Sequence, residues 1–518
     1  MWSKDDPQGR ESAKIRWELP RYTRGRGLDL GCGSEKAFPH FIGVDNGDHD
    51  EKFGFRTAAD VVVSTCEKLD IFASNCMDFV FSSHLIEHIK DTKAALSEWW
   101  RLIRQGGYLV LYYPHKELYP NIGTPGANPT HVHDFMPQDI IDIMREVGYW
   151  DLVRNETRDK GMEYSQFQVF QKAYDRKHVF SCDAPKPEKT AAVVRYGALG
   201  DMVIASSILP WLKEQGYHVT LYCSPYGYDV VKEDPHVDEF YIQDPNQVPQ
   251  QWLGDFWRYE SEHSHKFDRW INLSESIETS LLPDHERLSF HWPDSVRRQM
   301  MNRNYLEFTH EIAGVPPPYR PKFYATIGEK AWARAEREKY RGKVVLWSLS
   351  GSSVHKTWPH MDAIIARLLL QDNSTHVVLV GGTMDKLLQA GWEEERRVHR
   401  KAGEWSVRQA MAFTETVDLV VGSETGLLNA AGCMDVPKVV MLSHSTAENL
   451  TKHWRNTDAM IPSVPCYPCH RLHRTFEYCH QDAETGSAIC QAQIGIEEVW
   501  NAVRKKLGAK DGRILFAA

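Results

Sequence analysis

The stretch Leu28-Asp-Leu-Gly-Cys-Gly33 ends a short apolar run in two closely spaced glycines, and Ile42-Gly-Val-Asp45 follows after a brief connection. Glycines after a first strand let the backbone approach a ligand closely, and an acid at the end of a second strand can bind both hydroxyls of a ribose. We therefore expect a parallel sheet covered by helices, with a nucleoside-binding site at the carboxyl ends of these two strands.

The same alternation of short β-type runs and helical patterns continues along the chain. Its 518 residues are too many for a single core and suggest about three folding units. New α/β blocks begin at 191 and, beyond a proline cluster at 314–321, at 344. We therefore predict an α/β fold of three Rossmann-like units. The predicted bounds are 1–175 for a first domain, 176–189 for a linker, 190–325 for a second domain and 326–518 for a third.

Composition and charge narrow the classes of function. The chain carries 61 Lys and Arg residues against 70 Asp and Glu residues, for a net charge of −9. Proteins that bind nucleic acid by neutralising its phosphates usually carry an excess of basic residues, so nucleic acid is disfavoured as the main partner. A local basic patch is still compatible with the negative net charge. The amino-terminal segment has no signal-peptide core, and no apolar run reaches membrane-spanning length. We expect a cytoplasmic protein.

The first block resembles the class I S-adenosylmethionine-dependent methyltransferases over about residues 25–173. Besides the two motifs above, the resemblance includes the stretch Phe79-Val-Phe-Ser-Ser-His-Leu-Ile-Glu-His-Ile89. It implies S-adenosylmethionine as cofactor, bound by the glycine loop at its methionine end and by the acid of the second strand at its ribose. The residues concerned are Asp29, Gly31, Gly33 and Asp45. The alternative is a degenerate domain that keeps the fold as an interaction module.

A methyl acceptor needs a nearby base or an oriented lone pair, and imidazole supplies either near neutral pH. One candidate histidine follows the strand at 77–81, and two more follow a Gly/Pro-rich loop at 123–129. The predicted active-site rim therefore consists of His84, His131 and His133. The alternative is that the loop only turns the chain and that these histidines are structural.

Three further motifs lie in the second and third blocks. Arg195-Tyr-Gly-Ala-Leu-Gly-Asp201 is a strand end, a glycine-bearing turn and a helix start. Ser350-Gly-Ser-Ser-Val-His-Lys-Thr-Trp-Pro359 and Gly422-Ser-Glu-Thr-Gly-Leu-Leu-Asn429 each follow a later strand. Small residues with free amides at strand ends, a lysine beside them and a helix amino terminus make a site for a diphosphate. Taken alone, Asp201 is equally well interpreted as a helix N-cap.

These motifs, in this order, resemble the heptosyltransferase-type glycosyltransferases over about residues 190–508. The resemblance implies the GT-B arrangement of two Rossmann-like domains and an inverting reaction in which Asp201 deprotonates the acceptor hydroxyl. It also implies a nucleotide-diphosphate sugar as donor. The residues expected to bind this donor are Ser352, Lys356, Glu424, Thr425 and Gly426. Glu424 and Asn429 stand where the family usually has aspartate and histidine, so the donor sugar stays open.

Four of the ten cysteines lie close together in a loop at 465–490. Their spacing is C-x2-C-x9-C-x10-C, over Cys466, Cys469, Cys479 and Cys490. Four thiolates at such spacing can hold one tetrahedral ion. The segment resembles the cysteine-rich insert of some heptosyltransferase-like enzymes, which implies iron, whereas zinc is the chemical default. Two disulfides or free thiols are the alternatives.

We therefore predict a bifunctional glycan-modifying enzyme. An inverting glycosyltransferase would move a sugar from its nucleotide diphosphate to a glycan or surface-polysaccharide acceptor, and the first domain would transfer a methyl group. One alternative makes hydroxymethylated bases of viral DNA the acceptor, with the aromatic-rich stretch 252–303 stacking on bases. A second alternative makes the first domain a non-catalytic adaptor. The sugar, both acceptors, the metal and homo-oligomerisation through aromatic surface stay open.

Overall fold

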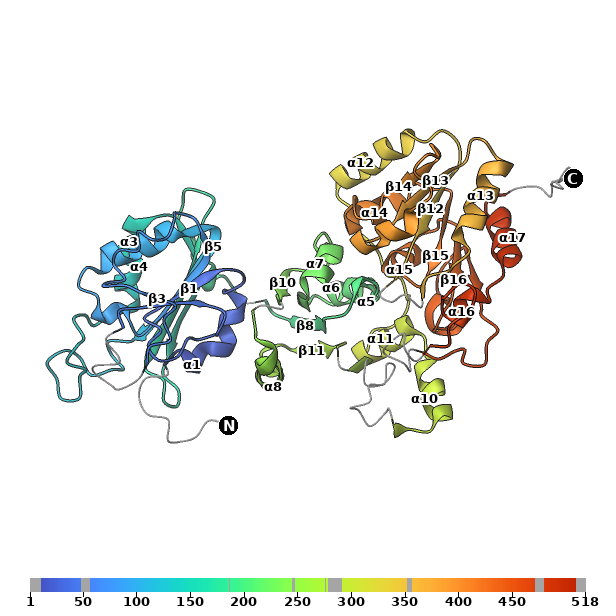
Figure 1. Cartoon of the computed structure of the whole chain (residues 1–518). Helices are drawn as coiled ribbons and strands as arrows, with labels where there is room; N and C mark the ends of the chain where they lie inside the picture. Colours follow the sequence, from blue (N-terminus) through green and yellow to red (C-terminus); the bar gives the residue numbers. More distant parts are fainter. Residues whose placement is uncertain are drawn as a thin grey trace, which may run out of the picture. The chain divides into compact units, whose positions relative to one another are not determined.

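A computed structural model shows three α/β sheets connected along one chain (Figure 1). It describes residues 11–47, 56–185, 187–244, 247–274, 276–277, 291–351, 356–470 and 479–508. The chain divides into two compact units. The first contains 1–187 with 242–266, and the second contains 188–241 with 267–518. The predicted α/β class with three Rossmann-like sheets is confirmed.

The first unit contains a seven-stranded mixed sheet in the order β3-β2-β1-β4-β5-β7-β6. Strands β1 to β5 run in parallel, and β7 lies antiparallel between β5 and β6. The central strands are mostly buried on both faces, which suits a sheet covered on both sides. The strands are β1 (Gly27–Leu30), β2 (Ile42–Asp45), β3 (Val61–Val62), β4 (Met77–Ser83), β5 (Ile103–Pro114), β6 (Trp150–Arg158) and β7 (Ser165–Lys172).

Short local signals fix the helices of this unit. Helix α3 begins where the Asp91 carboxylate accepts a hydrogen bond from the Ala94 amide at 2.9 Å, which satisfies an N–H group that has no partner within the helix. The buried Trp99 of this helix packs into the core and donates from its indole nitrogen to the Cys66 carbonyl at 2.9 Å. The α-helices beside this sheet are α1 (Glu11–Ile15), α3 (Thr92–Leu102) and α4 (Pro137–Val147), and the 3-10 helices are η1 (Arg16–Arg21), η2 (Ile86–His88) and η3 (Ser181–Asp183).

A segment from the middle of the chain, 242–266, groups with the first unit rather than with the second block in which we predicted it. It carries η5 (Gln250–Trp252), α8 (Leu253–Glu262) and η6 (Ser264–Lys266). The Trp252 ring lies 6.1 Å from the ring of Trp17 and 5.8 Å from that of Phe38, centroid to centroid. These ring contacts pack the half-buried Trp252 against the first unit.

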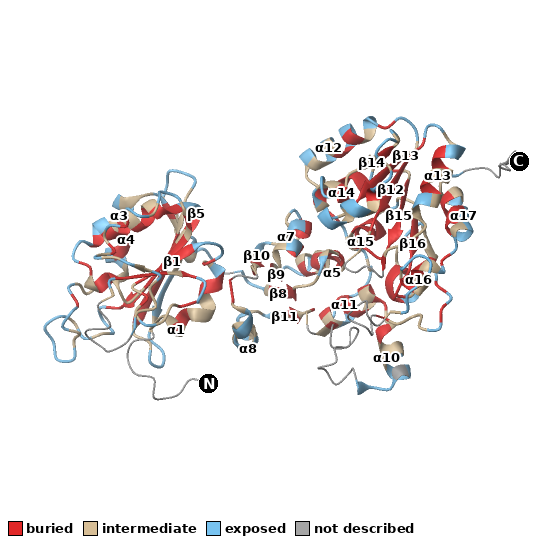
Figure 2. Ribbon diagram, in the orientation of Figure 1, coloured by how far each residue is buried: buried red, intermediate tan, exposed pale blue. Residues whose placement is uncertain are grey.

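The second unit holds two sheets. A four-stranded sheet has the order β10-β9-β8-β11, in which β8 pairs in parallel with both β9 and β11. A six-stranded sheet, parallel throughout, has the order β14-β13-β12-β15-β16-β17, and Figure 2 shows its central strands buried. The strands are β8 (Thr190–Arg195), β9 (His218–Cys223), β10 (Glu239–Ile242), β11 (Arg269–Asn272), β12 (Val344–Ser348), β13 (His376–Val380), β14 (Val398–Arg400), β15 (Leu419–Ser423), β16 (Lys438–Met441) and β17 (Thr457–Met460).

Helices connect these strands and cover the two sheets. The helices beside the four-stranded sheet include α5 (Leu199–Ala205), η4 (Ser206–Ile208), α6 (Leu209–Glu214), α7 (Pro225–Val231), α10 (Asp294–Met301) and α11 (Tyr305–Ala313). Those of the six-stranded part are α12 (Ile327–Glu338), α13 (Met361–Gln371), η9 (Thr383–Gln389), α14 (Val407–Thr414), α15 (Gly426–Gly432), η10 (Ala447–Thr451), α16 (Ile489–Ala492) and α17 (Ile496–Lys506). Among the described residues, none of the helices is both long and apolar enough to span a membrane.

Candidate functional site

The predicted cofactor residues meet at the carboxyl ends of β1 and β2. Gly31 and Gly33 have φ angles of +70° and +57°, in the left-handed region that favours glycine. A Cβ atom on Gly31 would lie only 3.0 Å from the Leu85 side chain. The Gly33 amide donates to Asp45 Oδ2 at 2.9 Å, so the acid that ends β2 braces the loop that follows β1.

Asp29 lies in the middle of β1 and is buried. Its Oδ2 atom accepts a hydrogen bond from the Ala37 amide at 2.7 Å. Burial raises the pKa of Asp29 to about 7, although the Ala37 amide and the charges of Lys36 and Arg16 act in the opposite direction. A cation bound next to this carboxyl would favour its ionised form.

His84, the first residue after β4, lies at the predicted methyl-acceptor rim. Its φ of +49° is unusual for a residue with a side chain. The Nε2 atom lies 3.0 Å from Ser165 Oγ and 3.4 Å from a carboxylate oxygen of Glu11. Burial is the main reason why the pKa of His84 falls well below its usual range, and the nearby charge of Lys14 acts in the same direction. The imidazole is therefore neutral at physiological pH and is a weak base.

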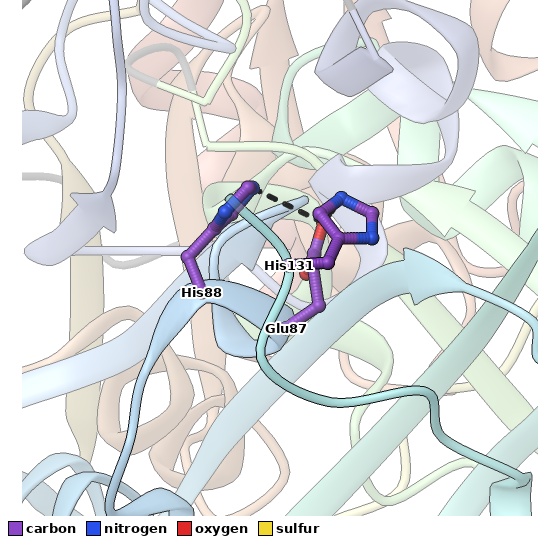
Figure 3. Close-up of side chains that lie close together, drawn as sticks. All are labelled: Glu87, His88 and His131. Carbon is purple, nitrogen blue, oxygen red and sulfur yellow. Dashed lines mark ion pairs between the residues drawn. The ribbon is translucent and has the colours of Figure 1, made fainter. Parts of the chain in front are cut away.

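Glu87, in η2, is the residue that the sequence analysis missed. Its carboxylate is buried, and the nearest nitrogens of His84, His88 and His131 lie 3.6, 3.8 and 3.9 Å from its Oε1 atom. No other described residue donates a hydrogen bond to either carboxylate oxygen. Burial raises the pKa of Glu87 to about 8. Figure 3 shows Glu87, His88 and His131 close together.

The three predicted rim histidines have different surroundings. His84 and His131 both approach the Glu87 carboxylate. His133 instead lies with its Nε2 atom 3.1 Å from the Lys90 carbonyl oxygen, although its backbone amide bonds to the Glu87 carbonyl oxygen. The signal that could have identified Glu87 was the Glu-His pair that begins four residues after the end of β4, near the strand end where ligands bind in such sheets.

Aromatic rings form one wall of this site. The Tyr119 ring lies 5.2 Å from the His131 ring and 5.0 Å from the Tyr164 ring, centroid to centroid. Tyr164 in turn lies 5.6 Å from His84, and its hydroxyl donates to a Glu11 carboxylate oxygen at 2.8 Å. The wall thus joins residues from three separate segments of the first unit.

In the second unit, Asp201 lies in the first turn of α5. The N-cap of this helix is Ala198 rather than Asp201; Asp201 is the third helical residue, and its Oδ2 atom accepts a hydrogen bond from the Ala198 amide at 2.7 Å. Its Oδ1 atom lies 3.3 Å from an Arg195 guanidinium nitrogen. The side chain keeps 31% of its surface exposed, so an acceptor can still reach the carboxylate.

Helix α5 of the four-stranded sheet and helix α15 of the six-stranded sheet approach each other closely. A Cβ atom on Gly200 would lie 2.5 Å from the Asn429 side chain, and one on Gly426 would lie 3.0 Å from Leu199. Any larger residue at either position would therefore have to displace a neighbour. The contact brings the turn that carries Asp201 beside the turn that precedes α15, although the two turns are more than two hundred residues apart in the sequence.

Glu424, just after β15, is buried with its carboxylate fully bonded. Oε1 accepts hydrogen bonds from the amides of Ser443 at 2.7 Å and Ser445 at 3.1 Å, and Oε2 accepts one from the Ser445 hydroxyl at 3.2 Å. His444 Nε2 lies 2.8 Å from Oε2. Burial alone would raise the pKa of Glu424, but His444, Lys356 and these donors hold it well below its usual range. The carboxylate thus braces the loop after β16.

The remaining predicted donor-site residues lie around Glu424. A Cβ atom on Gly351 would lie 2.7 Å from Lys356 Cδ and 2.9 Å from the Glu424 carbonyl oxygen, so the buried lysine runs along this turn. Thr425 caps α15 by accepting a hydrogen bond from the Leu428 amide at 3.1 Å. The predicted Ser352 lies outside the described residues.

The ten cysteines form no disulfide, so the predicted alternative of two disulfides in the 465–490 loop is not what the structure contains. Burial raises the pKa of Cys490 to about 12, and the neighbouring Cys469, Cys466 and Cys479 act in the same direction. The four thiols therefore share one neighbourhood. Among the described residues, only Glu87, His88 and His131 offer three ligand atoms within 4.8 Å of one another, so no three of the four sulfurs lie that close together.

Two family models match separate parts of the chain. Residues 28–111 match the model described as "Methyltransferase domain", and residues 286–480 match "Glycosyltransferase family 9 (heptosyltransferase)". No curated protein matches the chain.

Solved structures resemble each part at low identity. A glycosyl transferase family 9 structure from Veillonella parvula is 16% identical, with 62% of this chain and 98% of that chain covered and a TM-score of 0.46. The E. coli ADP-heptose lps heptosyltransferase II is 17% identical, with 62% of this chain and 98% of that chain covered and a TM-score of 0.43. A SAM-dependent methyltransferase from Thermotoga maritima is 18% identical, with 32% of this chain and 90% of that chain covered and a TM-score of 0.25. On the two family matches, the chain is a transferase that contains a methyltransferase domain and a glycosyltransferase family 9 (heptosyltransferase) region.

Proposed function

We propose that the chain is a bifunctional glycan-modifying enzyme, with inverting sugar transfer in the second unit and S-adenosylmethionine-dependent methyl transfer in the first. The observation that carries this proposal is the contact between α5 and α15, which places the Asp201 turn beside the Thr425–Gly426 turn. The functional domains would span 1–175, 190–325 and 326–518, with the segment 242–266 attached to the first. The acceptor would be a glycan or a surface polysaccharide.

In the sugar transfer, Asp201 would take the proton of the acceptor hydroxyl. The oxygen would attack the anomeric carbon of the donor, and the bond from that carbon to the diphosphate would break with inversion. Lys356, the Thr425 hydroxyl and the amides of Thr425 and Gly426 would stabilise the charge that develops on the diphosphate. Glu424 would act by holding this turn against the loop after β16, because its carboxylate already accepts hydrogen bonds from Ser443 and Ser445.

The residues of the first unit fit S-adenosylmethionine. Gly31 and Gly33 contribute no side chains to the loop after β1, and Asp29 and Asp45 supply carboxylates beside it. Asp29 would face the methionine end and Asp45 the ribose. The bound cofactor supplies an activated methyl group. The neutral imidazole of His84 and the aromatic wall of Tyr119 and Tyr164 would orient the acceptor and limit access of water.

We further propose a structural metal, zinc or iron, at Cys466, Cys469, Cys479 and Cys490. These four cysteines form no disulfide and three of them influence the pKa of the fourth, which supports the proposal, and four sulfur ligands would leave no open position for chemistry. Metal analysis of anaerobically purified protein should find about one ion per chain at these residues. The Cys466→Ser/Cys469→Ser double variant should lose that ion, and a wild-type protein without it would show free thiols instead.

A thermal-shift panel tests the two proposed activities together. Each product is tried separately: S-adenosylhomocysteine, ADP, UDP, GDP and CDP. A ligand at 100 times its dissociation constant adds about 2.7 kcal/mol to the stability of the state that binds it. We expect S-adenosylhomocysteine and one nucleotide to stabilise the protein. Stabilisation by a nucleotide alone would make the first unit an adaptor, and stabilisation by neither would contradict both activities.

A further inference from the structure

We infer that Glu87, His88 and His131 form a binding site for a divalent metal ion in the first unit, and that this ion holds the oxygen of the methyl acceptor. The inference rests on the proposed methyl transfer and specifies its substrate class: an alcohol or sugar hydroxyl rather than an amine or a carbon nucleophile.

The ligand atoms already converge. The candidate atoms of the three residues lie within 4.8 Å of one another (Figure 3), with Glu87 Oε1 3.8 Å from His88 Nε2 and 3.9 Å from His131 Nε2. Metal–ligand bonds of about 2.0–2.2 Å place neighbouring ligand atoms roughly 3 Å apart. Small rotations of the three side chains, without movement of the backbone, would close that difference.

The Glu87 carboxylate lacks the partners that a buried carboxylate normally has. Its side chain is only 3% exposed, and no other described residue donates a hydrogen bond to either oxygen. Buried carboxylates are as a rule hydrogen-bonded, paired with a cation or bound to a metal. The groups that face Glu87 are imidazoles of His84, His88 and His131, which act as metal ligands in their neutral form.

His88 is oriented as a metal ligand. Its Nδ1 atom lies 3.1 Å from the Thr130 carbonyl oxygen and 3.0 Å from the Thr130 hydroxyl. When Nδ1 carries the proton and donates it to the carbonyl, the lone pair of Nε2 is directed toward Glu87. Metal-bound histidines commonly donate their other ring N–H to a backbone carbonyl, which fixes the tautomer and the ring. Thr130 is therefore a positioning residue for the site.

The donor set indicates which ions fit. Two imidazoles and one carboxylate leave coordination positions open for substrate, as in catalytic rather than structural sites. Such a set suits Zn²⁺, Mn²⁺ and Fe²⁺. The site also adjoins the cofactor loop, because the Leu85 side chain, two residues before Glu87, lies against Gly31. The proposed metal site would therefore lie near the loop that is expected to hold the cofactor.

The chemical step balances without any further reagent. A metal ion lowers the pKa of a bound hydroxyl group, so the acceptor releases its proton to solvent. The acceptor oxygen then forms a bond to the methyl carbon of S-adenosylmethionine while the carbon–sulfur bond breaks. The sulfonium becomes the neutral thioether of S-adenosylhomocysteine, and no electrons are gained or lost overall.

Manganese titration of the full chain tests the site directly. Mn²⁺ is chosen because thiolates select softer ions, so the four cysteines do not compete for it. Free Mn²⁺ is measured by electron paramagnetic resonance for the wild type, Glu87→Gln, His88→Asn and the control His178→Asn, whose histidine packs on Trp150. We expect about one ion bound per wild-type chain, affinity more than about 10-fold weaker in both ligand variants, and no change in the control.

The outcomes separate the metal site from the methyl transfer. His88 is partly exposed, so we expect the His88→Asn variant to fold. Its Mn²⁺ affinity therefore tests the metal site even if the variant of the buried Glu87, Glu87→Gln, fails to fold. Equal Mn²⁺ affinity in wild type and His88→Asn, or no Mn²⁺ binding by the wild type, overturns the metal site. Stabilisation by S-adenosylhomocysteine is measured in the same samples. If S-adenosylhomocysteine binds and Mn²⁺ does not, only the proposed metal site is contradicted. If Mn²⁺ binds and S-adenosylhomocysteine does not, the metal site is supported and the proposed methyl transfer is contradicted.

Discussion

Glu87 and Glu424 are two buried glutamates at strand ends of two different sheets, and their surroundings are opposite. Glu424 accepts hydrogen bonds from three backbone amides and a hydroxyl and pairs with the His444 side chain, and its pKa is lowered. No other described residue donates a hydrogen bond to Glu87, and burial raises its pKa to about 8. A carboxylate that the protein satisfies itself is a structural brace, whereas one that it leaves unsatisfied is available to a ligand.

The Asp201 carboxylate is bonded by fewer groups than that of Glu424 and by more than that of Glu87. Its substitution should have the largest effect on activity. The carboxylate accepts the Ala198 amide at the start of α5 and pairs with Arg195 while part of its surface stays exposed. Asp201→Asn keeps an acceptor for this amide but removes the base, so sugar transfer should fall by about 10²- to 10⁴-fold while nucleotide binding is retained. Turnover and nucleotide affinity are measured side by side, with the exposed Asp229→Asn as control. Turnover equal to that of the control would exclude Asp201 as the base.

Glu424→Gln should be the most destabilising of the glutamate variants. The amide cannot carry the charge that pairs with His444, and its NH₂ group meets the donors that the carboxylate accepted. Breaking a buried pair from one side costs about 3–5 kcal/mol, which denaturant unfolding of the second unit would measure. Exposed Glu415→Gln is the matched control, with a change of about 0.5 kcal/mol or less. Equal stability of the two variants would show that Glu424 is no brace.

Asp29 makes cofactor affinity depend on pH. Its pKa of about 7 means that the carboxyl is largely protonated at pH 6 and largely ionised at pH 8. The cationic amino group of S-adenosylmethionine favours the ionised form, so affinity should rise about tenfold from pH 6 to pH 8 and then level off. Calorimetric titration at both pH values checks this, with Asp29→Asn as comparison. A tenfold rise that persists in Asp29→Asn would assign the titration to another group.

Glu87→Gln should have the smallest effect on the stability of the metal-free protein. The neutral amide replaces a carboxylate that has no hydrogen-bond donor from another described residue, so the free energy of unfolding should change by less than about 1 kcal/mol. Denaturant unfolding in the presence of a chelator provides the measurement. A loss as large as that expected for Glu424→Gln would mean that the two carboxylates do not differ in the way described.

The sequence was informative where strands are continuous and apolar. The block predicted to begin at 344 does begin there, with β12, and the block predicted to begin at 191 begins one residue earlier, with β8. The strand β6 (Trp150–Arg158) was not predicted, because half of it is polar and partly exposed. Such an edge strand shows neither a buried run nor a clear alternation.

Contacts between distant segments explain what the sequence could not reveal about the sites. Glu87 and His131 come from different loops, and nothing in local periodicity indicates that they meet. The donors that satisfy Glu424 lie in a loop about twenty residues later, so the motif alone could not reveal that this carboxylate holds the loop after β16. The attachment of 242–266 to the first unit likewise depends on ring contacts of Trp252 with Trp17 and Phe38.

The most direct test of the contrast between the two glutamates is anomalous X-ray diffraction from crystals soaked in Mn²⁺. We predict an anomalous peak about 2.2 Å from the ligand atoms of Glu87, His88 and His131, and none at Glu424. Absence of a peak at Glu87 in crystals that diffract well, or a peak at Glu424, would contradict the distinction between an open and a satisfied carboxylate.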